Sequence, residues 1–217
     1  MTHNINYKHI VDYLNDTLPD GTGILGELEK YAFEHCTPII QKEVRCFIDT
    51  LLECHKPRRI LEIGTAIGYS GIFFAQHLPE DGEIITLERD ADYAQRARAN
   101  FSRSGLAEKI TLIEGEAEES VKCLEGEFDL IFIDANKSKY RYYFDELFPK
   151  LRLGGMIICD NILYKGYVTS GEYLSPKQRT IVNALRDFLP FLANHPKLAT
   201  SIVPIGDGVT VSVKKEN

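Results

Sequence analysis

One stretch, residues 58–70 (RRILEIGTAIGYS), constrains the fold of this chain more than any other. The run at residues 60–63 is apolar at every position but Glu62, which is typical of a buried strand. Gly64 and Gly68 follow this run, and the segment after them (YSGIFFAQHL) has the composition of a helix. A strand that breaks at glycines into a helix is the nucleotide-binding turn of an open α/β sheet. Glycine is needed there because the backbone must turn tightly and let a ligand approach where a side chain would collide.

The residues of this turn favour S-adenosylmethionine (SAM) over a dinucleotide. The dinucleotide pattern G-x-G-x-x-G would place a glycine where this chain has Ala66. We interpret Glu62 as an acid inside the turn, which suits a cationic ligand group and would repel a pyrophosphate. Glu88 ends a second predicted strand, residues 84–88, about twenty residues past the glycines, where an acid accepts hydrogen bonds from ribose hydroxyls. Two acids without a phosphate-binding lysine therefore indicate SAM rather than NAD or ATP.

The length and composition predict one globular domain. A chain of 217 residues is long enough for one sizeable core, so a single domain is expected over residues 1–217. No run approaches the roughly twenty apolar residues of a membrane span, and the N-terminus lacks a signal-peptide core. We therefore expect a cytoplasmic protein that does not bind a membrane. The net charge of −7 argues against wholesale nucleic-acid binding but allows a local basic patch.

The cysteines predict neither a zinc site nor a set of disulfides. They are five in number, widely spaced, and contain no C-x-x-C pair. We expect them to be reduced and mostly buried thiols. They are Cys36, Cys46, Cys54, Cys123 and Cys159.

The order of apolar patterns predicts an α/β fold. Residues 1–56 are expected to form a helical N-terminal extension, and residues 57–217 a core in which strands alternate with helices. Such alternation implies a mostly parallel sheet with helices on both faces. The predicted helices are residues 5–18, 24–36, 39–54, 69–78, 91–103, 140–148 and 175–192. The predicted strands are residues 60–63, 84–88, 109–115, 128–134, 154–161 and two short strands that form an antiparallel hairpin around Gly206, Asp207 and Gly208.

A second group of polar residues follows two of the predicted strands. Asp134 comes directly after FDLIFI, and Asp160 with Asn161 comes after GMIIC. The carboxyl ends of parallel strands share one edge of a sheet, so these side chains are expected near one another. Two carboxylates and an amide oxygen are hard ligands that suit Mg²⁺. The alternative is that each acid only caps the helix or turn that follows it.

Several segments together resemble the metal-dependent class I O-methyltransferases, the family of catechol and caffeoyl-CoA methyltransferases. The resemblance lies in GTAIGYS (64–70), in Glu88 at the end of its strand, in IDANKSKY (133–140) and in CDNILYKG (159–166), and it extends from about Cys36 to the C-terminus. It implies the Rossmann-like fold of class I methyltransferases, with a mostly parallel seven-stranded sheet and a C-terminal antiparallel hairpin. It also implies that the chain binds SAM together with Mg²⁺, or Mn²⁺ in its place.

The resemblance assigns a role to each candidate residue. The methionine part of SAM would contact Glu62, Gly64 and Ser70, its ribose would contact Glu88, and its adenine would lie beside Glu116. The metal would be held by Asp134, Asp160 and Asn161. Lys137 would be the general base. Asp134 would also touch the cofactor and share in catalysis. One departure is that Ala135 and Asn136 replace the bulky residues that catechol methyltransferases have between the metal aspartate and the lysine. Smaller residues there predict a wider mouth and a larger substrate.

Within the family, the length of the chain and the sequences of its motifs most resemble those of the bacterial enzymes that methylate 5-hydroxyuridine at the wobble position of tRNA. The runs KSKYRYY (137–143) and YKGY (164–167) interleave bases with aromatic residues, which either contact phosphates and stack on bases or pack as ordinary helix residues. A small catechol-like or caffeoyl-CoA-like substrate is the alternative. A non-catalytic nucleotide-binding module is a more remote one, since a binder needs no metal ligands. Relatives of this bacterial type commonly pair, so a homodimer is expected.

Overall fold

A computed structural model of the chain describes residues 5–170 and 174–216. The chain divides into two compact units, each with its own set of strands. One unit is residues 14–123, and the other comprises the described parts of residues 1–13 and 124–217. Within each unit the strands carry the β-branched and aromatic residues that favour a half-buried or buried sheet.

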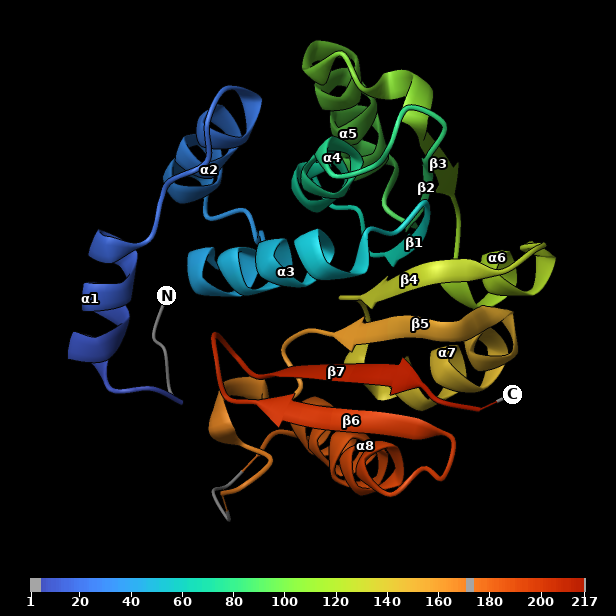
Figure 1. The fold of residues 1–217 in the computed structure, drawn as a ribbon. Helices are drawn as coiled ribbons and strands as arrows, with labels where there is room; N and C mark the ends of the chain where they lie inside the picture. The colour runs from blue at the N-terminus through green and yellow to red at the C-terminus, as the bar shows by residue number, and fades with distance from the viewer. Residues whose placement is uncertain (1–4, 171–173, 217) are drawn as a thin grey trace. The chain divides into compact units, whose positions relative to one another are not determined.

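The unit of residues 14–123 contains three parallel strands in the order β3-β2-β1 (Figure 1). Ile84 on β2 lies beside Ile60 on β1 and Ile110 on β3, so the three strands pack their apolar residues in one row. The strands are β1 (Arg59–Ile63), β2 (Glu83–Glu88) and β3 (Ile110–Glu114). The helices are α2 (Ile24–His35), α3 (Lys42–His55), α4 (Tyr69–Gln76), α5 (Ala91–Ser104) and α6 (Ala117–Cys123).

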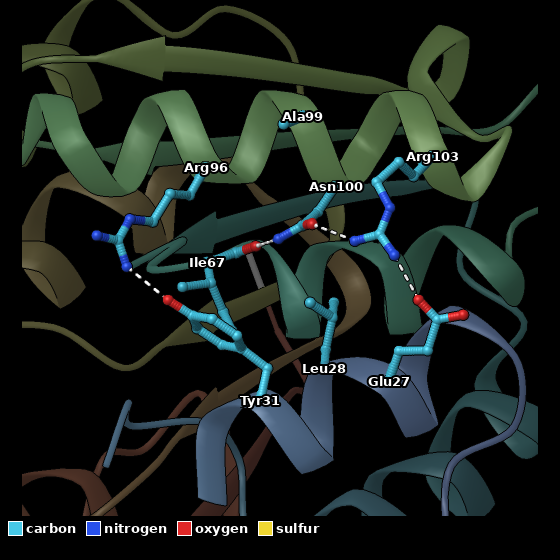
Figure 2. A pocket seen from close by; sticks show the side chains of 8 residues that line it. All are labelled: Glu27, Leu28, Tyr31, Ile67, Arg96, Ala99, Asn100 and Arg103. Carbon is cyan, nitrogen blue, oxygen red and sulfur yellow. Dashed lines mark hydrogen bonds and ion pairs between the residues drawn. The ribbon is translucent and has the colours of Figure 1, made fainter. Parts of the chain in front are cut away.

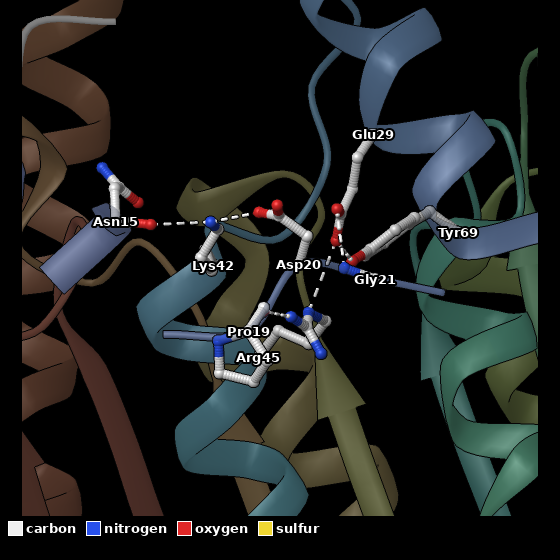
Figure 3. Close-up of polar contacts among 8 residues, drawn as sticks. All are labelled: Asn15, Pro19, Asp20, Gly21, Glu29, Lys42, Arg45 and Tyr69. Atoms are coloured by element: carbon white, nitrogen blue, oxygen red, sulfur yellow. Dashed lines mark hydrogen bonds and ion pairs between the residues drawn. The ribbon is translucent and has the colours of Figure 1, made fainter. Parts of the chain in front are cut away.

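A cluster of polar contacts ties α2 and α3 to the first residue of α4 (Figure 3). The Tyr69 hydroxyl donates a hydrogen bond of 2.5 Å to the carboxylate of Glu29, which also accepts one of 2.9 Å from the Gly21 amide. The Arg45 guanidinium, which is buried, lies 3.5 Å from the same carboxylate and donates to the Pro19 carbonyl. Because three segments share one carboxylate, the N-terminal helices of this unit are fixed to the helix that follows the glycine turn.

The other unit contains four strands in the order β4-β5-β7-β6, with α7 and α8 packed on one face (Figure 1). β4 and β5 are parallel, whereas β7 is antiparallel to both of its neighbours. The predicted hairpin is therefore confirmed. The strands are β4 (Phe128–Ile133), β5 (Leu151–Cys159), β6 (Leu198–Val203) and β7 (Val209–Lys214), and the helices are α7 (Tyr140–Leu147) and α8 (Pro176–Ala193). Helix α1 (Lys8–Thr17) contributes residues to both units.

The turn of the hairpin holds the segment that follows β5. Gly208 accepts a hydrogen bond from the Ile162 amide, and Asp207 accepts one from the Leu163 amide, each of 3.0 Å. A β-carbon added at Gly208 would lie 2.4 Å from a side-chain carbon of Leu163, and the φ of Gly208 is +86°. A glycine is required here for both reasons. The turn therefore fixes the backbone directly after Asp160 and Asn161.

Most predicted helices and strands are confirmed, with some differences. The three N-terminal helices are present, although residues 1–4 of the predicted extension lie outside the described residues. The third helix begins at Lys42 rather than Ile39, because Gln41 has an extended backbone (φ −67°, ψ 150°). Helix α6 was not predicted, because seven residues show little periodicity. That residues 1–217 form a single domain remains a prediction.

The prediction of mostly buried cysteines is wrong. Cys159 is buried in β5, and its burial raises the pKa of its thiol to about 12. Three other thiols are exposed and one is partly exposed, because they lie on outer helix faces and helix ends. All five are free thiols. Among the described residues, no helix has a stretch both long and apolar enough to cross a membrane.

Candidate functional site

The glycine turn after β1 has three residues with positive φ in five positions. These are Gly64 (φ 102°), Ala66 (φ 46°) and Gly68 (φ 85°). The turn is joined to β2 because the amide of Gly64 donates a 3.0 Å hydrogen bond to the carbonyl of Leu87. A β-carbon at Gly68 would lie 2.6 Å from the ring of Phe101, so this glycine allows the turn to pack closely on α5. The turn is thus a shaped backbone surface at the carboxyl end of β1.

Glu88 supports the glycine turn through its carboxylate. One oxygen accepts a hydrogen bond of 2.8 Å from the amide of Ala66, and the other accepts bonds of 3.0 and 2.9 Å from the amides of Arg89 and Asp90. Ala66 adopts a left-handed conformation that costs a non-glycine residue about 1–2 kcal/mol. Glu88 therefore stabilises an unfavourable turn, a role that its sequence position did not predict.

Glu62 lies in β1 and not in the turn, which corrects the prediction. Its side chain has 0% exposure and accepts a hydrogen bond from the hydroxyl of Thr86 on β2. Thr86 also contacts the hydroxyl of Thr65 in the turn. A carboxylate with no exposed surface reaches a ligand only if its neighbours move. The contact of Glu62 with the methionine part of SAM therefore remains a prediction that needs such a movement.

Ser70, Glu88 and Glu116, three more of the predicted cofactor residues, lie at or shortly after the ends of strands in the same unit, whereas Asp134 lies in the other unit. Ser70 is the second residue of α4 and is largely buried. The amide of Gly115 donates a 2.8 Å hydrogen bond to the carbonyl of Glu88, which brings the end of β3 next to the end of β2. Glu116 follows with an exposed side chain, 4.0 Å from the guanidinium of Arg89. Gly64, Ser70, Glu88 and Glu116 are therefore all placed at the carboxyl ends of β1, β2 and β3, as parallel strands predict.

The second unit brings together Asp134 and Lys137. The Lys137 ammonium lies 3.0 Å from a carboxylate oxygen of Asp134 and 3.3 Å from the carbonyl of Ala135. Both side chains are partly buried, at 17% exposure for Lys137 and 28% for Asp134. Asn136 caps the short helix that carries Lys137 by accepting a hydrogen bond from the Ser138 amide. The lysine is thus directed back onto the aspartate three residues before it.

Asp160 and Asn161 lie at the end of the neighbouring strand. The amide of Asp160 donates a 3.0 Å hydrogen bond to the carbonyl of Ile133, so the ends of β4 and β5 are adjacent. The Asp160 carboxylate has 1% exposure and accepts a hydrogen bond from the amide of Asn161. Burial, followed by repulsion from Asp134, raises the pKa of Asp160 well above its usual value. Asn161 has a φ of 54°, a conformation that asparagine adopts more readily than most residues.

This cluster fits a divalent cation by its donor chemistry. Two neighbouring carboxylates, one of them buried, form an anionic place where added positive charge would relieve repulsion. Among the described residues, no three His, Cys, Asp or Glu side chains gather as a metal site, so the set depends on the Asn161 amide as its third ligand. Oxygen ligands without nitrogen or sulfur suit Mg²⁺ or Mn²⁺ better than Zn²⁺.

Two of the three tyrosines of the run KSKYRYY, Tyr140 and Tyr143, pack in the core, whereas Tyr142 is partly exposed. Tyr140 and Tyr143 are buried, and the Tyr140 hydroxyl donates a 2.9 Å hydrogen bond to the Asp160 carbonyl. Arg141 pairs with Asp145 on the same helix. Stacking of Tyr140 or Tyr143 on a nucleobase is therefore excluded. The buried hydroxyl of Tyr140 instead fixes the backbone at Asp160.

Asn100 is a supporting residue that the sequence analysis did not identify. Its amide donates a 2.8 Å hydrogen bond from α5 to the carbonyl of Ile67 in the glycine turn. An asparagine on an exposed helix has no motif of its own, so no sequence signal marks this contact. Thr86 was also missed, because a single threonine inside an apolar strand has no motif of its own.

Comparison with known proteins gives consistent matches along most of the chain. The family model described as O-methyltransferase matches residues 17–215. The catechol O-methyltransferase of Niastella koreensis is 34% identical over 178 residues, which cover 78% of this chain and 79% of that protein. The caffeoyl-CoA O-methyltransferase of Populus kitakamiensis is 30% identical over 172 residues, covering 76% and 73% of the two chains.

A solved structure extends the likeness to three dimensions. The crystal structure of the O-methyltransferase from Bacillus cereus in complex with SAH superimposes with a TM-score of 0.81. The two sequences are 29% identical, and the match covers 95% of this chain and 97% of the other. SAH is the product that SAM leaves after it has donated its methyl group.

Proposed function

From the premise that this chain belongs to the O-methyltransferase family, we propose that it methylates 5-hydroxyuridine at the wobble position of tRNA. The chain is a SAM-dependent O-methyltransferase with the expected Rossmann-like α/β fold, as the family match and the solved relatives establish. The substrate, the metal and the roles of individual residues belong to the proposal. A tRNA substrate implies that the enzyme acts in the cytoplasm.

The single observation that carries the proposed mechanism is the cluster of Asp134, Lys137 and Asp160. We assign Asp134, Asp160 and Asn161 as the ligands of a divalent cation, which supplies positive charge that favours the deprotonated form of a substrate hydroxyl. Tyr140 keeps Asp160 in place through its 2.9 Å hydrogen bond to the backbone. Asp134 positions Lys137, since their side chains lie 3.0 Å apart.

The transfer itself needs one proton acceptor and an aligned methyl donor. We assign Lys137 as the general base, a role that requires its neutral amine form. A cation held by Asp134 and Asp160 would favour loss of a proton from the Lys137 ammonium, and the amine nitrogen would then take the proton of the substrate hydroxyl. The substrate oxygen then forms a bond to the methyl carbon of SAM while the bond from that carbon to sulfur breaks, so the sulfonium leaves as a neutral thioether. Gly64, Ser70, Glu88 and Glu116 would hold the donor in place.

The choice of 5-hydroxyuridine follows from its two adjacent oxygens. Its hydroxyl stands beside the C4 carbonyl, as the two hydroxyls of a catechol stand side by side, so one set of oxygen-binding residues serves both. The small residues Ala135 and Asn136 favour a substrate larger than a simple phenol. Lys139 and Lys165 are exposed on the segments that follow Asp134 and Asp160, where they add positive charge that favours phosphates. We further propose that the enzyme works as a homodimer.

A small catechol-like or caffeoyl-CoA-like molecule is the second candidate substrate. It is favoured by the relatives named catechol O-methyltransferase and caffeoyl-CoA O-methyltransferase, at 34% and 30% identity. The same residues would act in the same roles.

The experiment compares the two substrates under one set of conditions. Purified protein is supplied with radiolabelled SAM and Mg²⁺, and with either 5-hydroxyuridine-containing tRNA, the same tRNA without the modification, or catechol. Methylation of only the modified tRNA supports the proposal, whereas methylation of catechol alone would replace it with the second candidate.

Two variants test the residue assignments. Asp160→Asn should abolish turnover and leave SAH affinity nearly unchanged, because it removes charge from the proposed metal set only. Asp145→Asn removes an exposed carboxylate of the same unit and serves as the matched control. Full activity of Asp160→Asn, or of metal-stripped wild type in EDTA, would contradict the metal assignment.

A further inference from the structure

A cavity of about 360 Å³ lies between α2 and α5, apart from the residues assigned to the cofactor and the metal. Figure 2 shows side chains of α2 and α5 pointing toward each other across it. Its volume falls in the range of roughly 300–1,000 Å³ that small-molecule sites occupy. The cavity is large enough for one aromatic ring with a substituent.

The cavity has an apolar side. Leu28 and Ile67 are buried on this side, and Ala99 adds a methyl group from α5. The ring of Tyr31 forms one wall and is held by stacking on His35, with ring centroids 4.1 Å apart. A rigid aromatic wall together with an apolar side suits a planar ring, because ring and wall pack without ordering flexible side chains.

The rim of the cavity carries more positive than negative charge. Arg96, Arg103 and Glu27 line it, so the three formal charges sum to +1 in a chain whose net charge is −7. Arg103 pairs with Glu27 and also donates a 3.1 Å hydrogen bond to Asn100. Arg96 donates a 2.8 Å hydrogen bond to the hydroxyl of Tyr31, which is a neutral acceptor (Figure 2). An anionic ligand group would therefore be attracted most strongly at Arg96.

We propose that this cavity binds a planar aromatic molecule that carries a phosphate or a carboxylate group. The ring lies between Tyr31 and the apolar side, and the anionic group pairs with the guanidinium of Arg96. A nucleotide and a small aromatic acid share this chemistry. The proposal does not depend on the substrate proposed above, since the metal cluster contributes no residue to the cavity.

The cavity is connected to the cofactor turn through one side chain. Asn100, which lines the cavity, donates its hydrogen bond to the carbonyl of Ile67, the residue that follows Ala66 in the turn. A ligand that moves Asn100 would therefore alter the turn that Glu88 supports. Coupling of this kind is reciprocal, so cofactor and ligand must change each other's affinity by the same factor.

The test measures binding by calorimetry on the full chain saturated with S-adenosylhomocysteine, so that the cofactor site is occupied. The probes are uridine 5′-monophosphate and cinnamate, with uridine and cinnamyl alcohol as their neutral counterparts. At least one anion should bind, and its neutral counterpart should bind roughly tenfold to a hundredfold more weakly, as expected for a lost hydrogen bond to a charged group. Which anion binds distinguishes a nucleotide from a small aromatic acid as the source.

Variants then locate the binding. Arg96→Gln should weaken binding of the anion by a similar factor, and Ala99→Phe should abolish it by filling the cavity. Arg98→Gln is the matched control, because Arg98 lies on the same helix, is exposed, and pairs with Glu114 instead. The S-adenosylhomocysteine affinity of each variant checks that it is folded. The proposal is overturned when neither anion binds at millimolar concentration, or when Arg96→Gln and Ala99→Phe bind as tightly as the control.

Discussion

The carboxylate of Glu88 accepts three backbone amides, and replacing it with alanine tests whether it holds the glycine turn. The amides of Arg89 and Asp90 belong to exposed residues, so water can replace the lost acceptor at about 0.5 kcal/mol each. The amide of Ala66 is less accessible and belongs to a residue with left-handed φ, so its loss should cost about 1–3 kcal/mol. Glu88→Ala should therefore lower the free energy of unfolding by about 2–4 kcal/mol without any cofactor present.

The assay is thermal unfolding of the cofactor-free protein. For a chain of this length the change corresponds to a fall in Tm of roughly 4–16 °C. Glu83→Ala is the matched control, since Glu83 lies on the same strand with an exposed side chain that pairs with Arg59. A Tm of Glu88→Ala equal to that of the control would refute the role of Glu88 in the turn. If the turn is held as described, SAM affinity should fall as well.

Three further predictions concern the other unit and the hairpin. Stripped of metal, the protein should lose stability as pH rises from about 4 through the raised pKa of Asp160. The reason is that the Asp160 carboxyl group holds its proton more tightly in the folded state than in the unfolded state. Asp160→Asn should remove this part of the pH dependence of Tm. Gly208→Ala should lower the free energy of unfolding by about 1–3 kcal/mol more than Gly105→Ala does. Both glycines have positive φ, but only a β-carbon at Gly208 meets Leu163. Equal losses of unfolding free energy for the two variants in urea would exclude the steric cause. Cys159 should resist a thiol reagent at pH 8, whereas the three exposed cysteines should react within the same time. Rapid labelling of all five cysteines, detected by mass spectrometry, would contradict the burial of Cys159.

Most of the fold could be predicted from the sequence, because its strands are short apolar runs bounded by glycines and acids. Glu88 and Asp134 were located correctly at strand ends from their positions after such runs. Burial was harder to predict where aromatic and basic residues alternate. Tyr140 and Tyr143 lie three positions apart on one helix face, and only the packed structure shows that this face points into the core.

The candidate site could be predicted in its residue types but not in its hydrogen bonds. Sequence spacing places Glu62 near the turn, yet whether it belongs to strand or turn depends on which backbone amides pair with β2. The left-handed φ of Ala66 has no signal in the sequence, because alanine rarely adopts it. Contacts between distant segments, such as Asn100 with Ile67, depend on tertiary structure alone.

The carboxylate of Glu29 has a consequence for how the chain opens. It joins Gly21, Arg45 and the hydroxyl of Tyr69 at one point, so α2 cannot separate from α3 and α4 without breaking the contacts of Glu29 with both Arg45 and Tyr69 (Figure 3). Amide protons of α2 and of the first turn of α4 should therefore exchange with solvent in one cooperative event. A ligand on the glycine turn would slow that event, so an N-terminal helix would report cofactor occupancy through its rate of hydrogen exchange.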